Sequence, residues 1–131
     1  MADRPLIEQV RGFFEEYNKA FASIDGSRIA ALYSAPTVTV RADSSIHCLQ
    51  SREELARFFQ NVADTYHREG YRNGRFKNLE VISIGGRSAL ATMEWELLRQ
   101  DGSVIRGWRQ SYNLIRRDGG WQILVSTFHV T

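Results

Sequence analysis

The chain has 131 residues, of which 43% are hydrophobic and 24% charged, and its formal net charge is +2; these values predict one globular domain over residues 1–131 with a core of its own. The basic residues are scattered and form no stripe with interleaved aromatic residues, so we expect no nucleic-acid binding. Apolar runs are too short to span a membrane, the N-terminus has no secretory leader and Cys48 is the single cysteine, which together favour a cytoplasmic protein without an internal disulfide.

The first half of the sequence is expected to be mainly helical. Apolar residues recur at spacings of three and four over residues 6–21 and again over 55–66, which predicts two amphipathic helices. The second of these follows Ser51-Arg52-Glu53-Glu54, the pattern of a capping box. Between them we expect a short helix that buries Tyr33 and ends before Pro36, because the residue before proline resists helical angles.

Strands are expected around and after the last of these helices. β-Branched or alternating apolar residues mark them at 37–41, 46–49, 76–84, 88–99, 108–115 and 121–129. The last two are joined by Asp118-Gly119, which predicts a β-hairpin. Alternation along the final strand puts one set of residues on one face, which suits the wall of a pocket: Trp121, Ile123, Val125, Thr127 and His129.

This order of elements predicts an α+β fold, in which about three helices from the N-terminal half pack on one face of a mainly antiparallel sheet. A strand of about thirteen residues would span roughly 43 Å at about 3.3 Å per residue. That length exceeds the width of so small a domain. We therefore expect the sheet to curve strongly around the helices.

Four segments, in this order, carry a resemblance to a known family. They are Tyr17-x-x-Ala20-Phe21, Ile29-x-x-Leu32-Tyr33, Ser51-Arg52-Glu53-Glu54-Leu55-x-x-Phe58, and Asp118-Gly119-Gly120-Trp121-x-Ile123 with His129 near the end. Over nearly the whole chain the sequence resembles the NTF2-like superfamily, the cystatin-like cone fold of SnoaL-like polyketide cyclases, ketosteroid isomerase and scytalone dehydratase. The resemblance implies a cone-shaped roll with a deep, mostly apolar pocket inside it, and a homodimer through the sheet. It implies no particular reaction, because this fold hosts many unrelated activities.

The resemblance also implies which residues line the pocket. They are Tyr17, Tyr33, Arg41, Phe58, Met93, Trp95, Thr127 and His129. The final hairpin decides which residues of the neighbouring strand join them. The expected pairing brings Gln110 and Tyr112 inward, whereas a slip of one residue brings Arg109 and Ser111 inward instead.

His129 and Tyr17 are the candidate catalytic residues. Histidine titrates near neutrality, so His129, with Thr127 and Tyr112 nearby, is a candidate general acid or base. The hydroxyls of Tyr17 and Tyr33 are candidate donors to a substrate carbonyl. The alternative for each is structural: a histidine bonded to a backbone carbonyl, or tyrosines packed in the core.

Arg41 occupies the position that the resemblance gives to the general-base aspartate of ketosteroid isomerase. A guanidinium cannot accept a proton, so the resemblance argues against that isomerisation. An inward arginine needs a carboxylate of the chain or an anionic ligand, whereas one on the solvated face of an edge strand needs neither. His47, Cys48 and His67 lack the spacing of metal ligands and no glycine-rich phosphate loop is present, so we expect no metal and no cofactor.

Three functions are compatible with these residues. The first is a domain that binds a small acidic or aromatic molecule in an apolar pocket. The second is a cofactor-free isomerase, dehydratase or cyclase that uses His129 as acid or base with Tyr17 and Tyr33 as donors. The third is a protein-interaction module.

Overall fold

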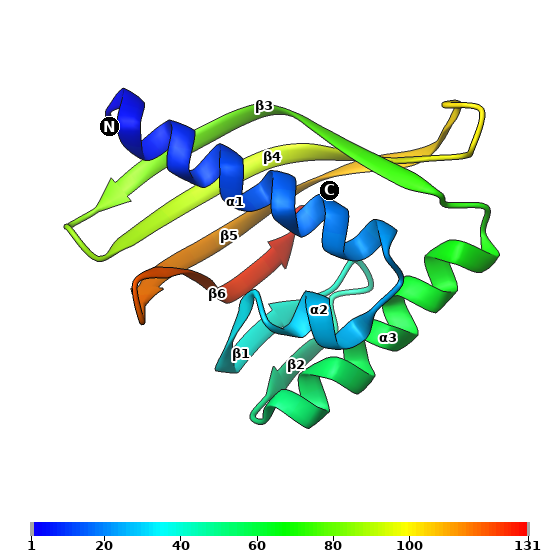
Figure 1. Cartoon of the computed structure of the whole chain (residues 1–131), viewed down its shortest axis with the longest axis horizontal. Coiled ribbons are helices and arrows are strands. Elements are labelled where there is room, and N and C mark those ends of the chain that lie inside the picture. The colour runs from blue at the N-terminus through cyan, green and yellow to red at the C-terminus, as the bar shows by residue number, and fades with distance from the viewer. Residues whose placement is uncertain (1, 131) are drawn as a thin grey trace.

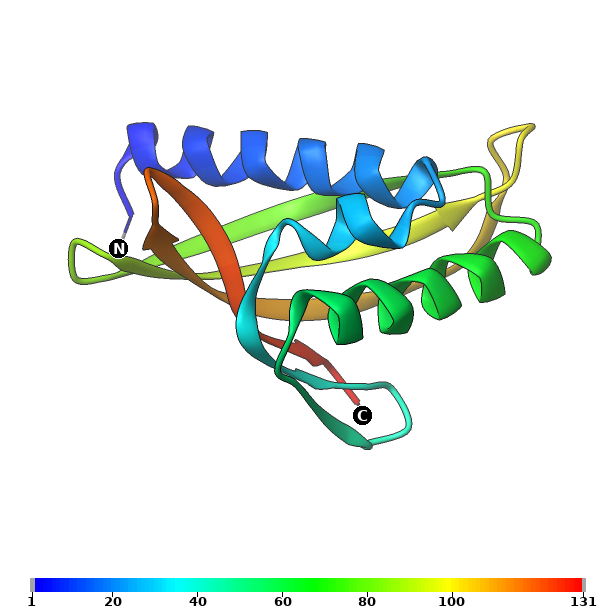
Figure 2. The ribbon, with the colours of Figure 1, turned by 60° about the horizontal axis from the view of Figure 1, so that its bottom comes forward.

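The computed structural model describes residues 2–130, which form three helices and six strands (Figure 1). In chain order the elements are α1 (Arg4–Ala22), α2 (Gly26–Ala30), β1 (Tyr33–Val40), β2 (Ile46–Leu49), α3 (Arg52–Arg68), β3 (Asn73–Ile84), β4 (Ser88–Leu98), β5 (Val104–Arg117) and β6 (Gly120–Phe128). The helices pack inside the curve of a single sheet (Figure 2), so the predicted α+β fold is confirmed. Within the described residues, no helix is both long and apolar enough to cross a membrane.

The sheet runs in the order β2-β1-β6-β5-β4-β3. Neighbouring strands are antiparallel, as predicted, except that β1 runs parallel to β6. This parallel pair joins the β1–β2 hairpin to the C-terminal strands. α1 packs across the β3 side of the sheet and α3 lies beside α2 and β1 (Figures 1 and 2), so the concave face is enclosed between the two long helices.

Side chains cap the starts of both long helices, and the cap of α3 is the one that the sequence indicates. Asp3 accepts a hydrogen bond from the backbone N–H of Leu6 at 3.0 Å and starts α1. Ser51 accepts one from the N–H of Glu54 at 3.1 Å and starts α3. The Glu54 carboxylate reaches back, as a capping box requires, although it accepts from the N–H of Gln50 rather than of Ser51. Caps of this kind each stabilise a helix by about 1 kcal/mol.

Tyr33 is a strand residue and not a helix residue, so the predicted second helix was too long. α2 ends at Ala30, and β1 begins at Tyr33, which pairs with Ile123 of β6. The carbonyl of Leu32 already accepts a hydrogen bond from the N–H of Ile123 at 2.9 Å. This bond commits the segment to the sheet before Pro36 is reached.

Phe14 lies at the centre of the core, fully buried between α1 and the concave face. Its ring contacts five others at centroid distances from 4.7 to 6.4 Å: Phe13, Tyr17, Phe76, Trp95 and Tyr112. Full burial of one phenylalanine stabilises a fold by about 1.5–3 kcal/mol. These contacts therefore hold α1 against β3, β4 and β5.

The β5–β6 hairpin contains a bulge that reverses the expected face of the last strand. Leu114 pairs with Ile123, as predicted from the turn, but Asn113 pairs with Val125. Leu124 is therefore an extra residue on β6, and the Thr37 hydroxyl donates a hydrogen bond to its carbonyl at 2.7 Å. Such a bulge interrupts alternation, so the residues after it that face inward are Ser126 and Phe128.

α2 packs against α3 with no room for a side chain at Gly26. A Cβ there would lie 2.3 Å from the carbonyl oxygen of Ala56. We expect Gly26→Ala to lower the free energy of unfolding by about 1–3 kcal/mol through overpacking. At Gly12 in α1 a Cβ would have no neighbour within 4 Å, so Gly12→Ala should raise it by about 0.5–1 kcal/mol. Urea denaturation of both variants measures the difference, and equal effects would contradict this packing.

Candidate functional site

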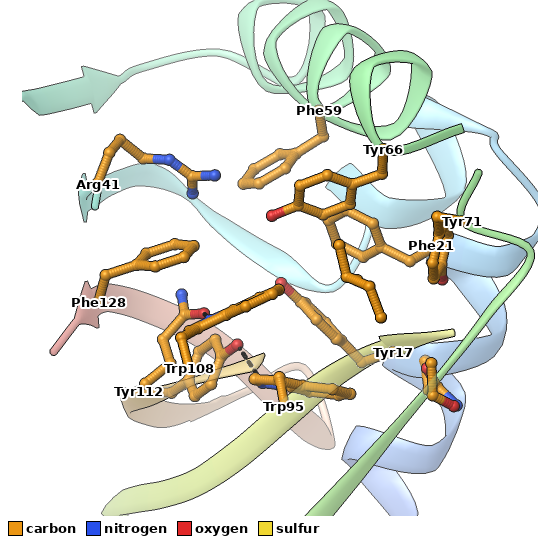
Figure 3. A pocket seen from close by; sticks show the side chains of 14 residues that line it. Tyr17, Phe21, Arg41, Phe59, Tyr66, Tyr71, Trp95, Trp108, Tyr112 and Phe128 are labelled. Atoms are coloured by element: carbon orange, nitrogen blue, oxygen red, sulfur yellow. Dashed lines mark hydrogen bonds between the residues drawn. The ribbon is translucent and has the colours of Figure 1, made fainter. Parts of the chain in front are cut away.

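An aromatic cavity lies between the helices and the concave face of the sheet (Figure 3). Its lining residues come from α1, α3, the strands and the loops next to them: Tyr17, Asn18, Phe21, Arg41, Phe59, Tyr66, Tyr71, Gly74, Trp95, Leu97, Trp108, Gln110, Tyr112 and Phe128. The space beside them, open solvent at the mouth included, is about 410 Å³, and the room that admits the centre of a water molecule is only about 30 Å³. One ordered water needs about 10–15 Å³ in that measure, so the cavity is narrow.

Five of the predicted pocket residues line this cavity. They are Tyr17, Arg41, Trp95, Gln110 and Tyr112. Of the two registers considered for the final hairpin, the structure has the one that turns Gln110 and Tyr112 inward rather than Arg109 and Ser111. Gln110 and Tyr112 are 3% and 1% exposed. Ser111 faces the other side of the sheet, where its hydroxyl bonds Thr92.

Three more predicted residues lie close to the cavity without lining it. Tyr33 is buried behind Tyr17, and their hydroxyl oxygens are 2.7 Å apart. Met93 is fully buried in the core beneath the cavity wall. Phe58 is half-buried, and the guanidinium of Arg41 lies over its ring.

Thr127 and His129 lie outside the cavity, so their expected placement was wrong. Both follow the bulge at Leu124, which turns them to the outer face of the sheet. His129 is exposed, and its Nε2 is 2.8 Å from the hydroxyl of Ser111. No part of the cavity lining therefore comes from the residue predicted to be the acid or base.

The prediction missed nine lining residues: Asn18, Phe21, Phe59, Tyr66, Tyr71, Gly74, Leu97, Trp108 and Phe128. Helical spacing already turned Phe21, Phe59 and Tyr66 inward, so their burial was predictable. Phe128 was missed because the bulge at Leu124 reverses the face of the residues that follow it. No local sequence signal distinguishes buried residues that line a cavity from buried residues that only fill the core.

Hydrogen bonds hold the tyrosine hydroxyls at the floor of the cavity. Tyr17 and Tyr33 share one, and the indole N–H of Trp95 donates to the Tyr112 hydroxyl at 2.8 Å (Figure 3). Burial raises the pKa of Tyr17 to about 12 and raises the pKa of Tyr33 and of Tyr112 well above the ordinary value. These hydroxyls are therefore neutral at physiological pH.

Stacked rings and two guanidinium groups surround the mouth of the cavity. Trp108 stacks on Phe128 with centroids 5.3 Å apart. Arg41 lies 4.6 Å from the centroid of Phe128, and Arg106 lies 5.6 Å from that of Trp108. Trp108 and Arg41 are only half-buried, so these two side chains form part of the accessible side of the lining.

The cavity lining contains no histidine, cysteine, aspartate or glutamate. It presents aromatic faces, neutral hydroxyls, two amides and one guanidinium, a set that binds and orients but does not accept a proton near neutral pH. Across residues 2–130, no group of three or more histidine, cysteine or acidic side chains is placed to hold a metal ion.

The curved sheet, the helices inside it and the enclosed cavity define an α+β cone-shaped domain. Over residues 8–131 the sequence matches the family described as NTF2-like protein (DUF6841), and the chain belongs to this family. The resemblance seen in its sequence segments is thereby confirmed. No curated protein matches the chain significantly.

Solved structures show the same fold at low sequence identity. A domain of unknown function with a cystatin-like fold from Nostoc punctiforme is 22% identical, with a TM-score of 0.74 over 97% of this chain and 78% of that one. Aln2 from a Streptomyces species is 14% identical, with a TM-score of 0.81 over 98% and 93%. An NTF2-like protein with a cystatin-like fold from Novosphingobium aromaticivorans is 15% identical, with a TM-score of 0.74 over 92% and 79%. These likenesses concern the fold alone.

Proposed function

We propose that the protein binds a small, largely planar organic molecule in the aromatic cavity. The observation that carries this proposal is the lining, in which nine of fourteen residues are aromatic. Ligand sites are typically concave and mostly apolar, with a few polar groups that orient the ligand. Aromatic walls also offer stacked and edge-to-face contacts to a ring.

The chemistry of the lining favours binding over proton-transfer catalysis. A cofactor-free isomerase, dehydratase or cyclase needs a group that exchanges protons with the substrate near neutral pH. The cavity offers neutral tyrosines with raised pKa and no histidine or carboxylate. The alternative of an enzyme with His129 as its acid or base is not supported, because that side chain lies on the outer face of the sheet, away from the cavity. No observation favours the third alternative, a protein-interaction module.

The narrowness of the cavity supports a small occupant and a movable mouth. A ring needs more room than the about 30 Å³ now open to water. Trp108 is the half-buried ring at the mouth, so we expect an entering ligand to displace it from Phe128. Binding should therefore change the tryptophan fluorescence of the protein.

A cavity-filling substitution tests the proposal. Small aromatic acids, phenols and ketones are screened by thermal shift and tryptophan fluorescence. We expect hits on the wild type to lose roughly tenfold or more in affinity in Leu97→Phe, whose larger side chain occupies the cavity. Leu90, on the outer side of the same strand, gives the matched control Leu90→Phe, which should bind as the wild type does. Absence of any hit, or equal binding by both variants, would overturn the proposal.

Two expectations drawn from the sequence stay predictions. A homodimer through the sheet is supported by Ile82 and Ile84, which are 52% and 50% exposed on the outer side of β3. The cytoplasm is supported by Cys48, whose thiol is free and exposed. The mass of the protein in solution tests the first of these.

A further inference from the structure

Among residues 2–130, the guanidinium of Arg41 at the mouth of the cavity has no carboxylate partner. Its Nη1 donates to the hydroxyl of Thr39 at 3.3 Å, and the guanidinium lies over the faces of Phe58 and Phe128. No carboxylate of residues 2–130 lies within 4.0 Å of it. Arg106 at the same mouth differs, because Glu69 pairs with it at 2.8 Å. A guanidinium partly withdrawn from water among aromatic rings favours an anion as its partner, and nothing in the described chain supplies one.

Gln110 adds a pair of N–H donors beside this charge. The indole N–H of Trp108 lies 2.9 Å from Oε1 of Gln110. Because an indole nitrogen only donates, the amide oxygen must be the atom that faces it. The Nε2 of Gln110 then faces away, with no hydrogen-bond acceptor among residues 2–130, and as an accessible atom it can still take a partner from within the cavity. Gln110 pairs in the sheet with Phe128, the residue whose ring Arg41 covers, and the amide and the guanidinium line the same cavity.

Tyr66 supplies the third donor, from the helical side. Its hydroxyl points toward the guanidinium of Arg41 (Figure 3). A guanidinium only donates, so the tyrosine oxygen rather than its proton faces it, and the hydroxyl proton can be donated to another partner. Burial raises the pKa of Tyr66 despite the opposing charge of Arg41, which keeps this proton in place at neutral pH.

We propose that Arg41, Gln110 and Tyr66 form a binding site for the carboxylate of an aromatic monocarboxylic acid. This inference rests on the proposed function, because the ring of the acid would occupy the cavity beyond the mouth. The planar fork of a guanidinium matches the two oxygens of a carboxylate, and amide and phenol donors add to it. One unpaired positive charge suits a monoanion better than a dianionic phosphate. Neutral amides and esters should bind more weakly, since they present their own N–H or alkyl groups to these donors.

The test compares two ligands that differ only in the head group, phenylacetate and phenylacetamide, by isothermal titration calorimetry. We expect the wild type to prefer the acid by roughly tenfold or more. Arg41→Gln should reduce this preference to less than about twofold, by removing the charge that selects the anion. Glutamate has nearly the shape of glutamine but carries a negative charge. Gln110→Glu should therefore weaken the binding of phenylacetate by roughly tenfold and change the binding of phenylacetamide little.

Arg106→Gln is the matched control, because it removes a guanidinium from the same mouth that Glu69 already neutralises. It should leave the preference within about twofold of the wild type. Equal binding of acid and amide to the wild type, or a preference that survives Arg41→Gln, would overturn the carboxylate site while leaving the proposed function standing. If neither compound, nor any other aromatic probe, binds the wild type, both fail. Circular dichroism establishes that each variant is folded. Arg41→Lys is the second variant at that position, and it should keep part of the preference for phenylacetate over phenylacetamide.

Discussion

Tyrosinate absorbance is expected to be absent from the folded protein at about pH 10, where free tyrosine is half ionised. All five tyrosines of the chain are buried, none more than 8% exposed: Tyr17, Tyr33, Tyr66, Tyr71 and Tyr112. Burial disfavours the phenolate, and it raises the pKa of every one of them, that of Tyr17 to about 12. A protein with no surface tyrosine should show no early step in its alkaline titration.

The same raised pKa values predict cooperative unfolding at high pH. A group whose folded pKa is raised contributes stability that is complete below its unfolded pKa, about 10 for tyrosine, and is lost as pH rises through the folded value. Above about pH 10 each tyrosine that stays protonated in the folded state costs that state up to about 1.4 kcal/mol per pH unit. Five such groups therefore use up a folding free energy of about 5–15 kcal/mol within roughly one to two pH units. Tyrosinate absorbance should therefore appear together with the loss of circular dichroism, above about pH 10 and before the pH reaches the folded pKa of Tyr17, about 12.

The urea-unfolded chain is the control for this titration, and all five of its tyrosines should ionise at about pH 10. A step at about pH 10 in the native protein, without loss of circular dichroism, would mean that at least one of these rings is accessible. Because Tyr17, Tyr66, Tyr71 and Tyr112 line the cavity, such a step would also place water deeper in the site than the structure does.

Local patterns were sufficient to predict most of the fold. Helical spacing and capping residues located α1 and α3 to within a few residues, and the Asp118-Gly119 turn set the first pairs of the β5–β6 hairpin. The error at Tyr33 had a different cause. Its place in β1 depends on Ile123, which lies far along the chain, and no local pattern carries that information.

The bulge at Leu124 could not be predicted for a similar reason. Ile123, Leu124 and Val125 are all apolar, so a shift by one residue among these three leaves none of them as a polar side chain on the wrong face. No glycine marks the position. What holds the bulge is Thr37 of β1, a long-range contact.

Arg41 shows how far the site itself could be predicted. The sequence left open whether this arginine was inward or on the solvated face of an edge strand. β2, not β1, forms that edge of the sheet, and Arg41 turns over Phe128 at the cavity mouth. Its unpaired charge depends on where every acidic side chain lies. That is a property of the whole fold.

Phe128 and His129 allow the reversed face of β6 to be measured directly. Phe128 is 7% exposed and stacks on Trp108, whereas His129 is exposed on the outer face. We expect Phe128→Ala to lower the free energy of unfolding by about 3 kcal/mol, since it removes a buried ring. His129→Ala should change it by less than about 0.5 kcal/mol, as surface substitutions usually do.

Unbroken alternation through β6 gives the opposite order, because it would bury His129 and expose Phe128. Urea denaturation of the two variants therefore decides between the bulged and the regular strand. Phe128→Ala should also weaken binding of any aromatic ligand, through loss of the ring on which Trp108 and Arg41 both pack, whereas His129→Ala should leave that binding unchanged. A loss of binding with His129→Ala instead would return this histidine to the site and restore the catalytic alternative built on it.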